Sequence, residues 1–253
     1  MAATKKAEGH EPLFHIVKRP AIAWWHAWLI RIGAVIAALL VAGIVTLALT
    51  GENPISVYGT MIKSSFGTNR RVWQLLQNIA MLLCVALAVT PAFRMRFWNI
   101  GAEGQVLIGG LATAACMITL GGKVPDGVLI LIMAVTAIVA GAIWGVIPAF
   151  FKANWGTNET LFTLMMNYVA MQLVQFFVVK WEVPKGSGKV GIINQDTHAG
   201  WLPTIGDNSY LLNIIIVALI VVILFVYLRY SKHGYEISVV GESENTARYI
   251  GIN

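Results

Sequence analysis

Six long apolar runs, separated by polar stretches, dominate the hydrophobic pattern of this chain. Each is close to the roughly 20 residues that an α-helix needs to cross a bilayer. The runs cover residues 29–49, 72–93, 100–120, 128–151, 161–179 and 210–228. A short amphipathic helix is also expected near residues 55–62. The pattern therefore predicts an all-α, polytopic membrane protein with about six transmembrane helices.

Basic residues indicate how these helices are oriented in the bilayer. Lysines and arginines precede the tryptophans at the start of the first run, and further basic residues follow the second, fourth and sixth runs. Because basic residues gather on the cytoplasmic side of membrane proteins, we expect a cytoplasmic arm over residues 1–28, a transmembrane domain over 29–230 and a cytoplasmic segment over 231–253. The first run begins too late and is too long for a signal peptide.

Composition narrows the range of functions. Of the 253 residues, 57% are hydrophobic and 12% are charged, whereas a soluble domain carries about 25% charged residues. The net charge of +6 comes without a basic and aromatic patch, so nucleic-acid binding is not expected. Cys84 and Cys116 lie within apolar runs and are expected to be packing residues rather than metal ligands. No histidine or aspartate lies in any run, which argues against an intramembrane enzyme.

The stretch that joins the second and third runs, Phe93–Gly110, is unusually polar for its position. It carries Asn99, Glu103 and Gln105 among several glycines. An ionisable residue in such a place is costly, so Glu103 needs a partner, a wet cavity or a function. Glycines allow close backbone approach and let a helix break and restart. We interpret the stretch as the start of a re-starting helix beside a polar pathway; the alternative is a short cytoplasmic loop before an ordinary helix.

A second group of polar residues opens the fifth run. Asn158 can cap the helix, and Glu159 suits its N-terminus electrostatically. Glu159, Thr163 and Asn167 follow one another at i, i+4 and i+8, which places them on one helix face. Such a stripe usually faces the bundle interior or a pathway. The alternative is hydrogen bonding between helices with no substrate contact.

The longest polar connection, residues 180–209, contains the pattern G-x-G-x-x-G at Gly186–Gly191. No strand precedes this pattern, so it is not interpreted as a nucleotide site. Val183 and Val190 also stand where a phosphate loop needs glycine and Ser or Thr. The predicted topology places this connection outside the cell, where it is expected to face an external partner.

The last twenty residues are too polar to span a membrane. Ser243 is a suitable N-cap, and Gly251 suits a helix stop. A short helix at the cytoplasmic surface is expected, with a solvated tail as the alternative.

Three blocks together resemble a known family. They are FRMRFWNIGAEGQVLIGG (93–110), GTNETLFTLMMNYVA (156–170) and GYEISVVGESENTARYIGIN (234–253). They are similar to the permease subunits of bacterial ABC importers for nucleosides and simple sugars. The run from Asn99 to Gln105 is closer to the nucleoside-type branch than to the ribose-type branch. The resemblance extends over nearly the whole chain after the N-terminal arm.

The resemblance implies a type II-like importer permease in the bacterial cell membrane. Such a permease pairs with a second permease, identical or related, and receives substrate from an extracytoplasmic binding protein. Cytosolic ATPase subunits dock on it and hold the ATP, so no directly bound cofactor, metal or catalytic residue is expected here. The polar groups expected near the pathway are Asn99, Glu103, Gln105, Asn158, Glu159 and Asn167. The resemblance assigns coupling to the ATPase to Gly241, Glu242, Asn245, Ala247, Arg248 and Tyr249.

Two alternatives stay open at this point. Members of the family continue past this length with further spans, so either the sequence is a fragment or those spans come from elsewhere. A secondary transporter driven by protons or sodium could use Glu103 and Glu159 as ion sites. That reading predicts inverted repeats, and no convincing repeat is visible in the sequence.

Overall fold

A computed structural model describes residues 23–206 and 208–252. Predictions on residues 1–22, which form most of the expected N-terminal arm, lie outside the described residues. The described part is helical, with one isolated β-bridge between Ile205 and Asn208. The chain divides into two compact units, residues 1–67 and 68–253, and each is described by itself.

The first unit contains α1 (Trp24–Thr50) and α2 (Pro54–Phe66). Asn53 caps α2 by accepting a hydrogen bond from the Ile55 N–H at 2.9 Å. The Tyr58 hydroxyl donates to the Leu39 carbonyl of α1 at 2.6 Å. The short helix expected near residues 55–62 is therefore confirmed and is longer than predicted. Because α1 already begins at Trp24, the last residues of the expected arm are helical.

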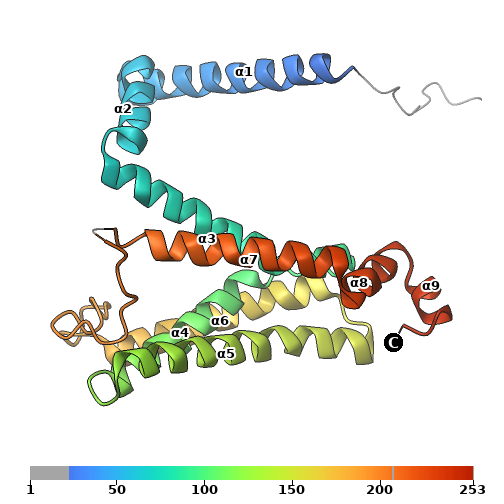
Figure 1. The fold of residues 1–253 in the computed structure, drawn as a ribbon. Coiled ribbons are helices and arrows are strands. Elements are labelled where there is room, and N and C mark those ends of the chain that lie inside the picture. Colours follow the sequence, from blue (N-terminus) through green and yellow to red (C-terminus); the bar gives the residue numbers. More distant parts are fainter. Residues whose placement is uncertain (1–22, 207, 253) are drawn as a thin grey trace, which may run out of the picture. The chain divides into compact units, whose positions relative to one another are not determined.

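The second unit carries the other long helices (Figure 1). Its helices are α3 (Asn69–Arg94), α4 (Ala102–Leu120), α5 (Asp126–Trp155), α6 (Glu159–Trp181), α7 (Leu211–Tyr230), α8 (Lys232–Glu242) and α9 (Glu244–Tyr249). Within the described residues, α1 and α3 to α7 are the six helices long and apolar enough to cross a membrane. The predicted polytopic all-α fold is confirmed. The helix α8 was not predicted.

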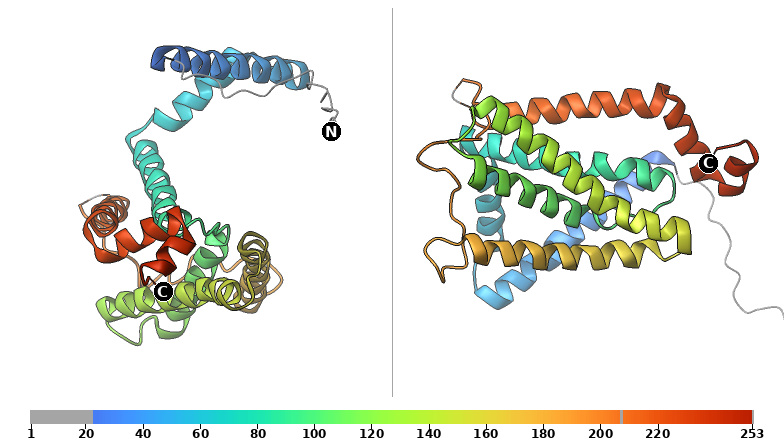
Figure 2. Two further views of the ribbon diagram at one scale, coloured as in Figure 1. Left: turned by 90° about the vertical axis from the view of Figure 1, so that its right-hand side faces the viewer. Right: turned by 90° about the horizontal axis from the view of Figure 1, so that it is seen from below.

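The centre of this unit is α4, which packs on α5 and α6, while α3 packs on α7 (Figures 1 and 2). Small residues allow the close contact between α4 and α5. A Cβ atom added at Gly109 would lie 3.4 Å from the Ala137 carbonyl oxygen, and one at Gly141 would lie 3.6 Å from the Gln105 carbonyl oxygen. Close backbone approach of this kind is typical of membrane helix packing, where van der Waals contact replaces the hydrophobic drive.

The long connection between α6 and α7 is folded onto the ends of the helices. The side-chain amide of Asn194 donates to the carbonyls of Met117 and Ala199, each at 3.0 Å. Gly200 packs against Leu129, whose side chain is fully buried. The positive φ of 78° at Gly200 suits glycine, which lacks the Cβ that makes this region costly. The connection is therefore a fixed surface of the unit.

Glu182 closes the glycine-rich part of this connection. Its carboxylate accepts hydrogen bonds from the Gly186 N–H at 2.7 Å and the Gly188 N–H at 2.8 Å. These amides belong to the pattern that resembled a nucleotide loop, so the chain's own carboxylate occupies the place of an anion. The two backbone hydrogen bonds, aided by the Lys185 charge, hold the pKa of Glu182 below its ordinary value.

This lowered pKa predicts a pH-dependent loop. Stabilisation by Glu182 is fully present above the ordinary carboxyl pKa, about 4.3, and is lost as the pH falls through the folded value. We expect Glu182→Gln to increase hydrogen exchange of the 183–190 amides at pH 7. The difference from the wild type should shrink in acid, where both side chains are neutral. Equal exchange in both proteins at pH 7 would contradict the assignment.

Candidate functional site

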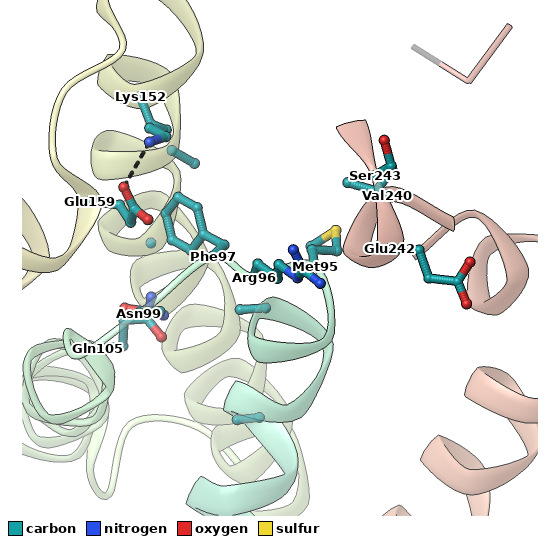
Figure 3. Close-up of a pocket in the computed structure, with 14 residues that line it drawn as sticks. Met95, Arg96, Phe97, Asn99, Gln105, Lys152, Glu159, Val240, Glu242 and Ser243 are labelled. Carbon is teal, nitrogen blue, oxygen red and sulfur yellow. Dashed lines mark ion pairs between the residues drawn. The ribbon is translucent and has the colours of Figure 1, made fainter. Parts of the chain in front are cut away.

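A cavity of about 690 Å³ lies at the end of the second unit where α3 and α5 end and α4 and α6 begin (Figure 3). It is lined by loop, helix and C-terminal residues. They are Ala88, Ala92, Met95, Arg96, Phe97, Asn99, Gln105, Gly145, Ala149, Lys152, Glu159, Val240, Glu242 and Ser243. The cavity therefore brings the polar stretch after α3 next to the C-terminal end of α8.

The backbone breaks and restarts at the cavity, as the glycines of this stretch predicted. Helix α3 ends at Arg94, and α4 begins at Ala102. In between, the Phe97 N–H donates to the Ala92 carbonyl at 2.9 Å. The Asn99 carboxamide oxygen accepts from the Gly101 N–H at 2.9 Å and so forms a local turn before α4.

Helix α6 holds the restarted helix through its polar stripe. The Thr163 hydroxyl accepts from the Ile100 N–H at 3.2 Å. Asn167 accepts from the Gly104 N–H at 2.8 Å and donates to the Ile100 carbonyl at 3.0 Å. Thr163 and Asn167 are buried. Their hydrogen bonds satisfy backbone groups that a helix start leaves without intrahelical partners, so these two residues join α6 to α4.

Gly104 permits this junction. A Cβ atom on it would lie 2.8 Å from the Asn167 carboxamide oxygen and 3.2 Å from the Asn167 Cα. The Cα is backbone and cannot rotate away, so a larger residue would separate the two helices. The glycines of this stretch therefore serve the close approach that the sequence predicted.

An ion pair bounds the cavity on one side. The Lys152 ammonium lies 2.8 Å from a Glu159 carboxylate oxygen, and the Glu159 side chain is 14% exposed (Figure 3). Lys152 is in the last turn of α5 and Glu159 in the first turn of α6. Both positions suit the helix dipoles. Asn158 caps α6 by accepting from the Leu161 N–H at 3.1 Å, and it does not line the cavity.

Gln105, one of the residues predicted near the pathway, has a side chain with unused hydrogen-bonding capacity. Its amide lies against Gly145 of α5, where a Cβ atom would collide with the Gln105 side-chain nitrogen. Within residues 23–206 and 208–252 the Gln105 side chain makes no hydrogen bond. An amide presents two donors and an acceptor with two lone pairs. Gln105 is therefore free to bind a polar solute in the cavity.

The structure brings together three of the six residues predicted near the pathway. Asn99, Gln105 and Glu159 line the cavity. Glu103 is exposed in the first turn of α4, away from the cavity lining, while Asn158 and Asn167 are used in capping and in the α4–α6 junction. Arg96, Phe97 and Lys152 also line the cavity, and the sequence pattern does not predict them. Only the fold shows that they share a cavity.

The C-terminal segment forms the side of the cavity opposite the Lys152–Glu159 pair, through Val240, Glu242 and Ser243 (Figure 3). Gly241 packs directly on α3, because a Cβ atom there would overlap the Arg94 carbonyl oxygen. Helix α8 begins at a cap that was not predicted, in which Ser231 accepts from the Gly234 N–H at 3.0 Å. The sequence Ser231-Lys232-His233-Gly234 carried this signal.

The short helix expected near the C-terminus is confirmed as α9. Ser243 caps it by accepting from the Thr246 N–H at 3.3 Å, and Gly251 has the positive φ of 80° typical of a helix stop. Of the residues assigned to coupling, Ala247 is 2% exposed, whereas Asn245, Arg248 and Tyr249 are exposed. Ala247 therefore fixes the segment, and the other three are available to a partner.

Comparison with known proteins identifies the family. Residues 71–253 match the family described as the branched-chain amino acid transport system / permease component. The chain belongs to this permease family. The match includes the whole cavity and the C-terminal segment, while α1 and α2 precede it. A multi-pass membrane protein is what both this family and the six apolar helices indicate.

Three relatives show the breadth of the family. A glucose ABC transporter permease protein of Haloferax volcanii is 28% identical over 93% of this chain and 64% of its own length. A guanosine ABC transporter permease protein of Bacillus subtilis is 30% identical over 85% of this chain and 62% of its own. A nucleoside ABC transporter permease protein of Lactococcus lactis is 27% identical over 89% and 64%. No solved structure matches the chain. The chain spans less than two thirds of the length of these relatives.

Proposed function

We propose that this permease-family chain is part of the transmembrane permease subunit of an ABC importer for a nucleoside or simple sugar in a bacterial cell membrane. Relatives named for guanosine, nucleosides and glucose support the substrate class. The observation that carries the proposal is the shared cavity of Gln105 and Glu242, which joins polar groups suited to a solute to the predicted coupling segment.

The chemistry of the cavity fits such substrates. Gln105 and the Asn99 side-chain NH₂ have no hydrogen-bond partner in the described part of the chain, and both line the cavity beside Phe97. Amides both donate and accept, as hydroxyl-rich sugars and nucleobases require. The Lys152–Glu159 pair closes one side with its two charges balanced. Asn99 and Gln105 are therefore proposed to contact the solute, and Glu159 to shape its route.

The partners follow from the same proposal. A cytosolic ATPase subunit docks on α8 and α9, binds the ATP and hydrolyses it, so this chain contributes transport and no catalysis. A second permease subunit completes the pathway. An extracytoplasmic binding protein delivers substrate to the side that carries the connection between α6 and α7. Transport by such a complex requires a helix bundle with two conformations. Nucleotide binding to the ATPase subunit must shift the equilibrium between these conformations.

Reconstitution of the full-length permease with its ATPase and binding protein tests this proposal. Uptake of labelled nucleosides and sugars is measured in liposomes with ATP, with a non-hydrolysable analogue, and with imposed proton or sodium gradients. Uptake that requires hydrolysis supports the proposal. Uptake that follows an ion gradient and ignores ATP would favour the secondary transporter with ion sites at Glu103 and Glu159, and would overturn it.

Charge reversal at Arg248 tests where the ATPase docks. Arg248 is exposed, and in the described residues it forms no ion pair. We expect Arg248→Glu to weaken co-purification of the ATPase about 10-fold or more, because like-charge contact across an interface costs several kcal/mol. The control is Lys123→Glu. Lys123 lies in the turn after α4, at the end of that helix away from the cavity. Unchanged co-purification of Arg248→Glu would count against the docking assignment.

A further inference from the structure

A second groove in the same unit lies between α3 and α7, with a volume of about 570 Å³. Its walls are apolar, and its charged groups are two arginines. The lining residues are Leu87, Thr90, Arg94, Val221, Leu224, Phe225, Leu228, Arg229 and Tyr230. None of the residues assigned to the transport pathway belongs to it.

The polar groups of the groove gather at one end. Arg94 is the last residue of α3, and Arg229 and Tyr230 are the last two of α7. The rest of the groove is lined mainly by aliphatic and aromatic side chains. The Thr90 hydroxyl donates a hydrogen bond to the Ala86 carbonyl of its own helix at 2.7 Å. A polar solute such as a sugar would find no hydrogen-bond partners along this wall. An acyl chain would fit it.

The two arginines have no acidic partner among the described residues. In residues 23–206 and 208–252, neither Arg94 nor Arg229 forms an ion pair or a hydrogen bond through its guanidinium group, and both are exposed. Helices α3 and α7 pack side by side, so both arginines lie at the same end of the pair (Figures 1 and 2). Guanidinium groups pair well with phosphate because their planar donors match its oxygens.

We propose that this groove binds one anionic phospholipid from the leaflet beside α8. The phosphate lies between Arg94 and Arg229, and an acyl chain runs along Leu224 and Phe225 towards the membrane centre. Basic pockets between membrane helices are recurrent sites for anionic head groups. The proposal places the exposed ring of Tyr230 at head-group level, as is usual for interfacial aromatic residues.

The site has a consequence for the C-terminal segment. The Arg94 side chain lines the lipid groove, while its carbonyl oxygen lies directly under Gly241 of α8. A lipid that holds the Arg94 side chain therefore fixes the end of α3 against which α8 packs. The bound lipid therefore stabilises the contact between α8 and the end of α3.

Native mass spectrometry of the assembled full-length complex tests the site. The complex is exchanged into nanodiscs of phosphatidylcholine with phosphatidylglycerol, and retained lipids are counted after release. We expect preferential retention of phosphatidylglycerol, and a loss of preference of about 30-fold in the double variant Arg94→Gln/Arg229→Gln. The control is Arg70→Gln, which removes one arginine from the opposite end of α3. It should retain the wild-type preference.

A steric variant keeps the test independent of charge. Leu224→Trp fills the apolar wall and leaves both arginines in place, so it should reduce phosphatidylglycerol retention as well. Equal retention in wild type and double variant would overturn the proposal. An equal loss in Arg70→Gln would reduce it to a general charge effect, and normal retention in Leu224→Trp would place the lipid outside the groove. Absence of bound lipid in the assembled complex would mean that protein covers the groove, which also overturns the proposal.

Discussion

Replacing Gly241 by alanine is expected to uncouple the proposed transport from hydrolysis by the proposed ATPase partner, while the protein still inserts into the membrane. A Cβ atom at this position would overlap the Arg94 carbonyl oxygen, which is backbone and cannot rotate away. The end of α8 must therefore move off α3, and Val240, Glu242 and Ser243 leave their places around the cavity. Overpacking of this kind costs roughly 1–3 kcal/mol, which is enough to shift α8 away from α3.

The measurement compares ATP-driven uptake with ATPase activity in the reconstituted full-length complex. Uptake per ATP hydrolysed should fall roughly 5-fold or more in Gly241→Ala, as for a loss of about 1 kcal/mol of coupling free energy. Gly110→Ala is the matched control, because Gly110 is also helical and a Cβ atom there meets nothing within 4 Å. If Gly241→Ala transports as well as Gly110→Ala, the contact with Arg94 does not transmit motion. Membrane abundance of both variants shows whether insertion is intact.

Replacing Asn167 by leucine is expected to separate α4 from α6. The change keeps a side chain of similar size but removes the bonds to the Gly104 N–H and the Ile100 carbonyl. A buried backbone group left without a partner costs roughly 1–3 kcal/mol. Two backbone groups lose a partner here, which would cost roughly 2–6 kcal/mol in total. Bonds between membrane helices are individually weak, with averages near 0.6 kcal/mol, so we place the loss at the lower end of that range, about 2 kcal/mol.

Thermal unfolding of the purified full-length permease in detergent measures this loss. Asn167→Leu should unfold several degrees below the wild type. Gln172→Leu is the control on the same helix, because Gln172 is exposed and makes no hydrogen bond in the described part of the chain. Should both variants unfold at the wild-type temperature, Asn167 would not be holding α4, and its position in the polar stripe would again suggest solute contact.

The two interpretations of the polar stripe on α6 show how much helical periodicity can predict. The spacing of Glu159, Thr163 and Asn167 correctly placed them on one helix face, but it offered pathway and helix contact as equal options. The structure divides the stripe: Glu159 lines the cavity with Lys152, and the other two are bonded to the start of α4. Periodicity reports the face of a single helix, and the neighbour of that face depends on how the other helices pack.

Glu103 is a second residue whose surroundings the sequence did not predict. Its cost inside a membrane was evident from the sequence, yet the sequence did not tell which surface it faces. It is exposed on α4 and lies outside the cavity, while Gln105, two residues later, lines it. Two residues of an α-helix differ in direction by more than half a turn, so a small change in helix orientation decides which one meets the solute.

The sequence by itself determined most of the helices of this protein, with α8 the one that was missed. Apolar runs of bilayer length defined the membrane helices, and local caps such as Ser243 and Asn158 marked where helices begin, because these signals depend on neighbours along the chain. Only the tertiary structure decided which polar groups are spent on other helices and which remain free. It also showed that Gly241 packs against the Arg94 carbonyl group, a contact between residues far apart in the chain. Such contacts depend on the packing of whole helices, which no local pattern specifies.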